Sequence, residues 1–306
     1  MDGLPGGIRR LTFPLPMGIQ HVHCYLLPGD DGWTLVDTGL GVAHGRERWA
    51  DVGPVARIVV THFHPDHAGG GEDAQGATGA PVLQGADDYE QCEAVWGTPD
   101  WSQRLADFLR THGLPEQVAV ELRDEAQRFA PFVRFARDPE LLREGDAVDG
   151  WEVFELPGHA DGHICLLRDG VLVAGDHLLG QITPTIGLYP ASRPDPLGDY
   201  LASLERTIEL APRIALPGHG DPIGDPAGRV REIQEHHRIR LDETAAALGE
   251  APRNAHEVSL VLFGDDLDAF GRRFALAETL AHLERLVREG RAARAGDDNS
   301  VSYTAA

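Results

Sequence analysis

Residues 59–70 read VVTHFHPDHAGG and place three histidines and one aspartate within six positions. These side chains are His62, His64, Asp66 and His67. An apolar run precedes them, so His62 and His64 lie two apart at the end of a predicted strand and project to the same side. Pro65 ends that strand, and the following turn brings the last two side chains back toward the same point. Because zinc and similar divalent ions prefer neutral imidazole and carboxylate ligands, the motif predicts a metal site.

Three more candidate ligands follow apolar runs farther along the chain. They are His159 in FELPGHADGH, Asp176 in VLVAGDH and His219 in IALPGHG. Neighbouring glycines allow the backbone to approach a cavity closely. Seven candidate ligands exceed what one tetrahedral ion can use, so we expect two divalent ions that share a bridging carboxylate. The ligands favour zinc, with iron or manganese as alternatives.

The ligand order HxHxDH, then His, Asp and His, with LVDTG upstream at 35–39, resembles the metallo-β-lactamase fold superfamily over about residues 8–225. The resemblance implies an α/β (α+β) fold, a four-layer αββα sandwich with the metals at one edge of its two sheets. It also implies a division of the ligands: His62, His64 and His159 on one metal, Asp66, His67 and His219 on the other, and Asp176 as the bridge. Asp37 of LVDTG would support the ligand loop from behind.

A Pro/Gly-rich stretch at 220–228 predicts a boundary near residue 227, between a catalytic domain, 1–227, and a C-terminal domain, 228–306. The second domain contains helical patterns near 229–248 and 255–263 and a longer one with leucines at helical spacing, followed by a hairpin around the turn 296–299. This order of elements predicts a winged helix. Together with GDHLLGQIT, LPGHG and EHHRIRLDETAAAL, it is similar to the branch of the superfamily that includes β-lactamase-like protein 2.

A polar, helical segment interrupts the first domain at about 86–138, with Trp96, Trp101, Phe108 and Phe129 distributed through it. The sequence leaves two interpretations open. The segment is a lid or substrate wall, or it is a helical pair with no role at the site.

Two metal ions about 3.5–4 Å apart can hold a bridging hydroxide, because metal binding lowers the pKa of water to about 7. We therefore predict a binuclear hydrolase that cleaves a small-molecule ester, lactone or thioester, with Asp66 orienting the hydroxide as well as binding metal. Tyr189 and His177 are candidate donors to the oxyanion, and packing roles are the alternative for both. His21 and His23 form another HxH, but no third ligand lies near them in sequence, so we expect them to pack or to line the pocket.

The charge of the chain argues against nucleic acid as its partner. The chain has 49 acidic and 27 basic residues, all arginine, and its formal net charge of −22 repels polyanions and anionic membranes. The alternative function is an endoribonuclease acting on single-stranded RNA, because the resembled branch includes ribonucleases. A stripe on the C-terminal domain could serve it, formed by Arg272, Arg273, Arg285 and Arg288. We instead expect that domain to close the active-site cleft or to form a homodimer.

Cysteine use and hydropathy indicate where the protein acts. Cys24, Cys92 and Cys165 are odd in number and widely spaced, which favours reduced thiols. The first sixteen residues contain no apolar segment typical of a secretion signal, and no run reaches the ~18 apolar residues of a membrane span. We therefore expect a cytoplasmic protein that does not enter membranes.

Overall fold

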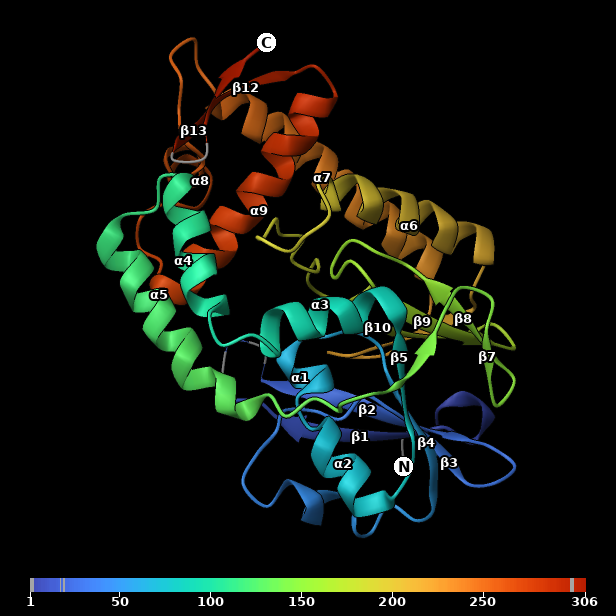
Figure 1. The fold of residues 1–306 in the computed structure, drawn as a ribbon. Helices are drawn as coiled ribbons and strands as arrows, with labels where there is room; N and C mark the ends of the chain where they lie inside the picture. The colour runs from blue at the N-terminus through green and yellow to red at the C-terminus, as the bar shows by residue number, and fades with distance from the viewer. Residues whose placement is uncertain (1–2, 17, 19, 298–299) are drawn as a thin grey trace.

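The computed structural model describes residues 3–16, 18, 20–297 and 300–306 (Figure 1). Two β-sheets form the N-terminal part of the molecule. The six-stranded sheet has the order β1 Arg9–Pro14, β2 His21–Pro28, β3 Trp33–Val36, β4 Val55–Val60, β5 Val82–Gly85 and β6 Glu140–Leu142. The five-stranded sheet has the order β11 Ile214–Pro217, β10 Val171–Gly175, β9 Ile164–Arg168, β8 Trp151–Glu155 and β7 Ala147–Val148.

Both faces of each sheet are apolar: one face packs against the other sheet, and the opposite face is covered by helices. Val59 of β4 and Val173 of β10 belong to one buried cluster between the sheets. Their neighbours Val60 and Leu172 face outward into two further clusters, which the helices cover. Since successive side chains of a strand point to opposite faces, strands that are apolar throughout need a layer on each side. This is the predicted αββα sandwich, and the structure confirms it.

The outer helices begin at sequence signals that satisfy their free backbone amides. The helices of the two outer layers include α1 Pro65–Ala68, α2 Gly71–Thr78 and α6 Pro196–Leu210. The side chain of Asp195 accepts a hydrogen bond from the amide of Gly198 at the start of α6. Asp225 does the same for Gly228 at the start of α7, Pro226–Ala247. In both cases Asp caps the helix and Pro occupies its first position, where a missing N–H costs nothing.

The segment 86–138 is helical, as predicted. It forms α3 Ala86–Trp96, α4 Trp101–Thr111 and α5 Glu116–Phe129, followed by the short 3-10 helix η3 Ala130–Phe132. Helices α4 and α5 pack side by side, and α5 also lies against the C-terminal helix α9 (Figure 1). This segment therefore connects the sandwich to the C-terminal region.

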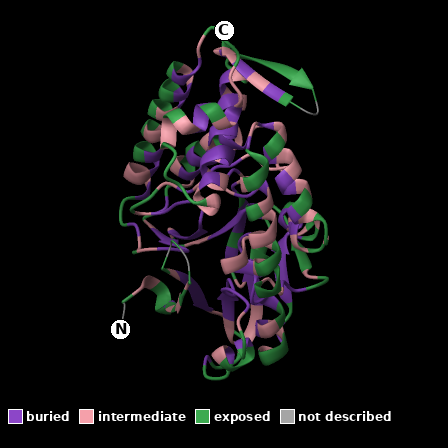
Figure 2. Ribbon diagram, turned by 90° about the vertical axis from the view of Figure 1, so that its left-hand side faces the viewer, coloured by how far each residue is buried: buried purple, intermediate pink, exposed green. Residues whose placement is uncertain are grey.

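The C-terminal region contains the predicted order of three helices and a hairpin. After α7 come α8 Ala255–Phe263, α9 Ala269–Arg288 and the antiparallel pair β12 Ala292–Asp297 and β13 Ser300–Ala305. Two residues of the predicted turn, 298–299, lie outside the described residues. Figure 2 shows buried residues continuing from the sheets into these helices, and one apolar cluster includes residues of β10, α6, α7 and α9. The winged-helix designation and the boundary at 227, which falls in the first turn of α7, stay predictions.

None of the helices in the described part of the chain combines the length and the apolar character that crossing a bilayer requires.

Candidate metal centre

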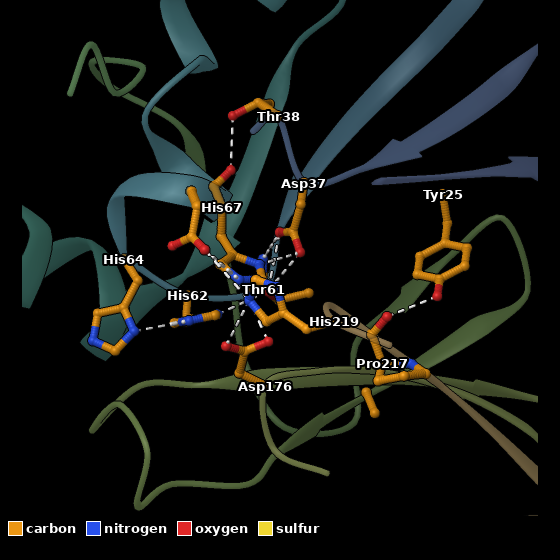
Figure 3. A network of polar contacts seen from close by, with 12 residues as sticks. Tyr25, Asp37, Thr38, Thr61, His62, His64, His67, Asp176, Pro217 and His219 are labelled. Atoms are coloured by element: carbon orange, nitrogen blue, oxygen red, sulfur yellow. Dashed lines mark hydrogen bonds and ion pairs between the residues drawn. The ribbon is translucent and has the colours of Figure 1, made fainter. Parts of the chain in front are cut away.

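The seven predicted ligands converge at one edge of the sandwich, on four segments that each follow a strand. His62 follows β4, His159 follows β8, Asp176 follows β10 and His219 follows β11. Figure 3 shows the carboxylate of Asp176 directed at the imidazoles of His67 and His219, with Asp37 on the opposite side of His67. The ligands form three groups, and within each group the ligand atoms all lie within 4.8 Å of one another. The groups are His62, His64 and His159; His62, His67 and Asp176; and Asp66, His67 and His219. The structure therefore brings all seven together, and the cluster can hold metal.

Hydrogen bonds on the far sides of the rings orient His62 and His159, and His64 contacts His62 within the cluster. Nε2 of His62 lies 3.1 Å from Nδ1 of His64, while Nδ1 of His62 contacts Oγ1 of Thr61 at 3.0 Å. Nδ1 of His159 donates to the carbonyl of Thr185 at 2.9 Å, which leaves its Nε2 directed into the cluster. A bond to one ring nitrogen sets which tautomer the other nitrogen presents, so these contacts prepare the imidazoles as ligands.

Asp176 lies between the two groups. Its Oδ1 is 3.5 Å from Nε2 of His67, and its Oδ2 is 3.2 Å from Nε2 of His219 and 3.7 Å from Nε2 of His159. Asp66 approaches from α1, with Oδ2 3.3 Å from Nε2 of His219. Asp176 is thus in contact with imidazoles of both groups, as a carboxylate that bridges two ions would be.

The buried atoms of the cluster provide a test of whether metal fits. Nε2 of His67, His159 and His219 and Oδ1 of Asp176 are buried and have no hydrogen-bond partner. Buried polar atoms almost always have a partner, because leaving one unsatisfied costs about 1–3 kcal/mol. Four such atoms directed at one point are satisfied by a cation. The residues present therefore fit divalent metal.

The charges of the cluster lead to the same conclusion. Burial favours the neutral imidazole of His219, but Asp176 and Asp66 outweigh it and raise its pKa to about 10. The pKa of His67 is also raised, because Asp176 and Asp37 outweigh burial. The pKa values of Asp66 and Asp176 are lowered despite burial, since the two imidazoles stabilise their charge. Without metal, protons carry the positive charge that these carboxylates require.

Asp37 supports the ligand loop, as predicted. Its carboxylate accepts hydrogen bonds from the backbone amide and hydroxyl of Thr61 and from Nδ1 of His67 at 2.8 Å. It therefore holds the loop on both sides of His62. Asp37 adopts a positive φ of 62°, a conformation that Asp tolerates better than most residues and that turns its carboxylate toward the loop.

His21 and His23 have a positioning role that the sequence did not reveal. The carbonyl of His21 accepts from Nδ1 of His219 at 2.6 Å, and its Nε2 accepts from the amide of Gly220 at 3.1 Å. Nε2 of His23 lies 2.9 Å from the carbonyl of Gly220. The two side chains hold the turn that presents His219. The sequence signal was the HxH itself, but strand β2 meets that turn only in the folded chain.

The two candidate oxyanion donors lie in different environments. The ring of His177 is fully buried, its Nε2 contacts Oγ1 of Thr207 at 2.7 Å, and burial lowers its pKa to about 3. His177 thus packs between β10 and α6, and its role as an oxyanion donor, like its alternative, stays a prediction. Tyr189 is partly buried against the apolar cluster that includes residues of α9, and burial raises its pKa. Its catalytic role stays a prediction.

The four arginines considered as a basic stripe do not form one. Arg272 is buried, and Arg273 packs on the aromatic rings of its own helix. Arg285 and Arg288 lie 3.1 and 3.6 Å from the carboxylate of Asp195. Their charges are dispersed or paired, so these four residues do not form a continuous cationic surface.

Three residues of α3 that contact the ligand loops were missed. Asp88 and Trp96 bond the backbone of Phe63, and Gln91 bonds Asp161. Among these, the sequence offered only an acidic residue in the first turn of a helix, which is common without any role at a site.

Two family models match the chain. The model described as metallo-beta-lactamase superfamily matches residues 17–219, and the model described as metallo-beta-lactamase-like, C-terminal domain, matches residues 241–306. The crystal structure of a metallo-beta-lactamase family protein from Thermus thermophilus is 36% identical, with 99% of each chain covered and a TM-score of 0.84.

Named relatives carry the comparison further. The probable metallo-hydrolase YqjP of Bacillus subtilis is 29% identical over 96% of both chains. The beta-lactamase-like protein 2 homolog of Drosophila melanogaster is 24% identical over 95% of this chain and 91% of its own. The atrochrysone carboxyl ACP thioesterase of Claviceps purpurea is 25% identical over a shorter match, 46% of this chain and 48% of its own.

Proposed function

The chain belongs to the metallo-beta-lactamase superfamily, and from this premise we propose that it is a hydrolase that uses two divalent ions to cleave an ester, lactone or thioester bond in a small molecule. The observation that carries the proposal is the cluster of His and Asp ligand atoms, four of which are buried without a hydrogen-bond partner. Zinc is the ion that we expect, because tetrahedral sites of imidazole and carboxylate suit it.

The ligands divide between the ions as the family resemblance implies. His62, His64 and His159 would hold one ion, and Asp66, His67 and His219 the other, with Asp176 between them. Divalent ions bound there polarise a carbonyl oxygen and supply a water molecule whose pKa is close to 7.

Asp66 is the residue best placed to handle the proton of that water. Its side chain is 23% exposed, against 7% for Asp176, so it is the more accessible carboxylate of the cluster. It extends from the first turn of α1 toward His219. We infer that Asp66 orients the attacking water and accepts its proton.

The proposed substrate is neutral or weakly charged. The chain contains no lysine, and the arginines that could have formed a cationic surface on α9 are buried, stacked or paired. The thioesterase among the relatives supports including thioesters in the proposed bond class.

The C-terminal region is proposed to help hold the site closed. Arg229, in the first turn of α7, donates to the carbonyls of Leu179 and Ile182 at 2.7 and 2.9 Å. Those residues begin the loop that leads to Thr185, whose carbonyl orients His159. The region therefore has a direct connection to one metal ligand. Whether it also forms a homodimer stays a prediction.

The test is hydrolysis of a substrate panel by the metal-loaded protein. The panel contains an aryl ester, several lactones, acyl thioesters and a single-stranded RNA, with the metal-stripped protein as the blank. We expect turnover of at least one carbonyl substrate that disappears with the metal. Cleavage of RNA alone would contradict the proposal.

A further inference from the structure

The backbone between two ligands is held from both sides by helix α3. Phe63 separates His62 from His64. The amide of Phe63 donates to Oδ1 of Asp88 at 2.9 Å, and its carbonyl accepts from Nε1 of Trp96 at 2.9 Å. Since both polar groups of one peptide segment are bonded to the same helix, α3 fixes the direction in which the two imidazoles leave the backbone.

The same helix holds the loop that carries His159. The side chain of Gln91 forms two bonds with Asp161: it accepts from the amide at 3.1 Å and donates to Oδ2 at 3.2 Å. Beside Asp161, the backbone of Gly162 packs directly on the start of α3, where an added Cβ would overlap the amide nitrogen of Asp88. Only glycine permits this approach.

Asp88 is the most constrained of these contacts. Its side chain is fully buried, and its second oxygen accepts from Nε2 of Gln84 at 2.6 Å. Burying a carboxyl group costs free energy unless hydrogen bonds compensate for the lost water. The two hydrogen bonds of Asp88 do so, and they fix the groups that donate them. Here the fixed groups are the end of β5, where Gln84 lies, and the ligand loop that follows β4.

The other ligand group is supported from elsewhere. His67 is held by Asp37, and the turn that presents His219 is held by His21 and His23 of β2. Asp37 also bonds Thr61, so it serves both groups, whereas the α3 contacts described above lie directly beside His62, His64 and His159.

We propose that α3 is the positioning element of the site formed by His62, His64 and His159, acting through Asp88, Gln91 and Trp96. This inference rests on the proposed two-metal function. The first helix of the segment 86–138 then has a role other than a lid or a helical pair without function: it positions the ligands of one of the two ions.

The test compares two substitutions on the same helix, each of which removes one hydrogen-bonding group and keeps an aromatic ring. Trp96→Phe removes the N–H that bonds Phe63 and keeps an aromatic ring in place. Tyr89→Phe is the matched control, because it removes a hydroxyl whose contacts, with Glu93 and the amide of Asp138, lie at the surface. Stepwise Zn²⁺ and Co²⁺ affinities are measured against a chromophoric chelator, and the Co²⁺ absorption spectrum is recorded at one and two equivalents.

We expect Trp96→Phe to weaken one of two binding steps about 10- to 100-fold, the range for groups that orient ligands, and to change the Co²⁺ spectrum of that site alone. Tyr89→Phe should leave both steps within about threefold of the unmodified protein.

Two substitutions of Asp88 give a second comparison. Asp88→Asn should retain most of the metal affinity, because an amide oxygen still accepts from Phe63 and the Gln84 amide can turn. Asp88→Leu should lose it, because leucine accepts no hydrogen bond. Gln91→Leu, at a partly exposed position, provides a second probe if Trp96→Phe fails to fold.

The outcomes separate the two claims. An unmodified protein that binds no metal would overturn the proposed function. Two ions in the unmodified protein with unchanged steps in Trp96→Phe and Gln91→Leu would overturn only the role of α3. Equal weakening of both steps would also contradict it, because α3 would then support the whole centre and not one site.

Discussion

Nδ1 of His67 donates a 2.8 Å hydrogen bond to Oδ2 of Asp37, and both side chains are almost completely buried. The bond fixes the tautomer of His67 and directs its Nε2 at the carboxylate of Asp176, 3.5 Å away. Asp37, the residue that directly follows β3, thus determines how a candidate ligand is presented.

Replacing Asp37 tests this relationship. In Asp37→Asn the amide group must face a donor, either Thr61 or His67, so one of the present bonds is lost. We expect the affinity for one metal ion to fall about 10- to 100-fold. Chelator competition measures it, with the exposed Asp30→Asn as a control for the loss of charge. An unchanged affinity would show that Asp37 has only a structural role.

Asp66→Asn is expected to lower kcat/KM by about 100-fold or more, because general-base contributions are typically 10²- to 10⁴-fold. The amide can still approach His219 but cannot accept a proton. Steady-state kinetics on the substrate identified by the panel measures the change. Glu72→Gln, an exposed acid in the first turn of α2, is the control. Activity within about threefold of the unmodified protein would remove Asp66 from the chemistry.

Metal binding is expected to release protons and to strengthen as pH rises. The pKa of His219 in the metal-free protein is about 10 and that of His67 is also raised, so both hold a proton at pH 7 that a metal must displace. Competition by protons therefore weakens as pH increases toward 10. Calorimetry at pH 7.5 in two buffers of different ionisation enthalpy should give more than one proton released per chain. A heat independent of the buffer would contradict this.

Gly162→Ala is expected to destabilise the fold by about 1–3 kcal/mol, the usual cost of overpacking, because its Cβ would overlap the backbone of Asp88. Chemical denaturation of the metal-free protein measures the loss. Gly224→Ala is the control, since a Cβ there meets nothing within 4 Å. Equal stability of the two variants would show that α3 moves freely relative to the ligand loop.

The ligands could be predicted from sequence because each follows a strand, and strands that run the same way end at one edge of a sheet. The parallel pair β10 and β11 delivers Asp176 and His219 in this manner, and the parallel pair β3 and β4 delivers the supporting Asp37 beside His62. The supports could not be predicted. Trp96 meets Phe63 across 33 residues, and His21 meets His219 across 198, so both contacts depend on how layers pack.

Adjacent residues can lie in different surroundings, which sequence alone does not reveal. His177 directly follows Asp176, and the two side chains have separate surroundings, one in the core beside Thr207 and the other in the cluster. Arg272 and Arg273 are adjacent on α9, where consecutive residues point about 100° apart, so Arg272 is buried while Arg273 is partly exposed.

The most direct test of the two-metal centre is anomalous diffraction from crystals of the protein loaded with zinc, with data collected on both sides of the zinc absorption edge. The account predicts two peaks about 3.5–4 Å apart, one within bonding distance of His62, His64 and His159 and the other of Asp66, His67 and His219, with Asp176 touching both. A single peak, or peaks away from these side chains, would contradict it.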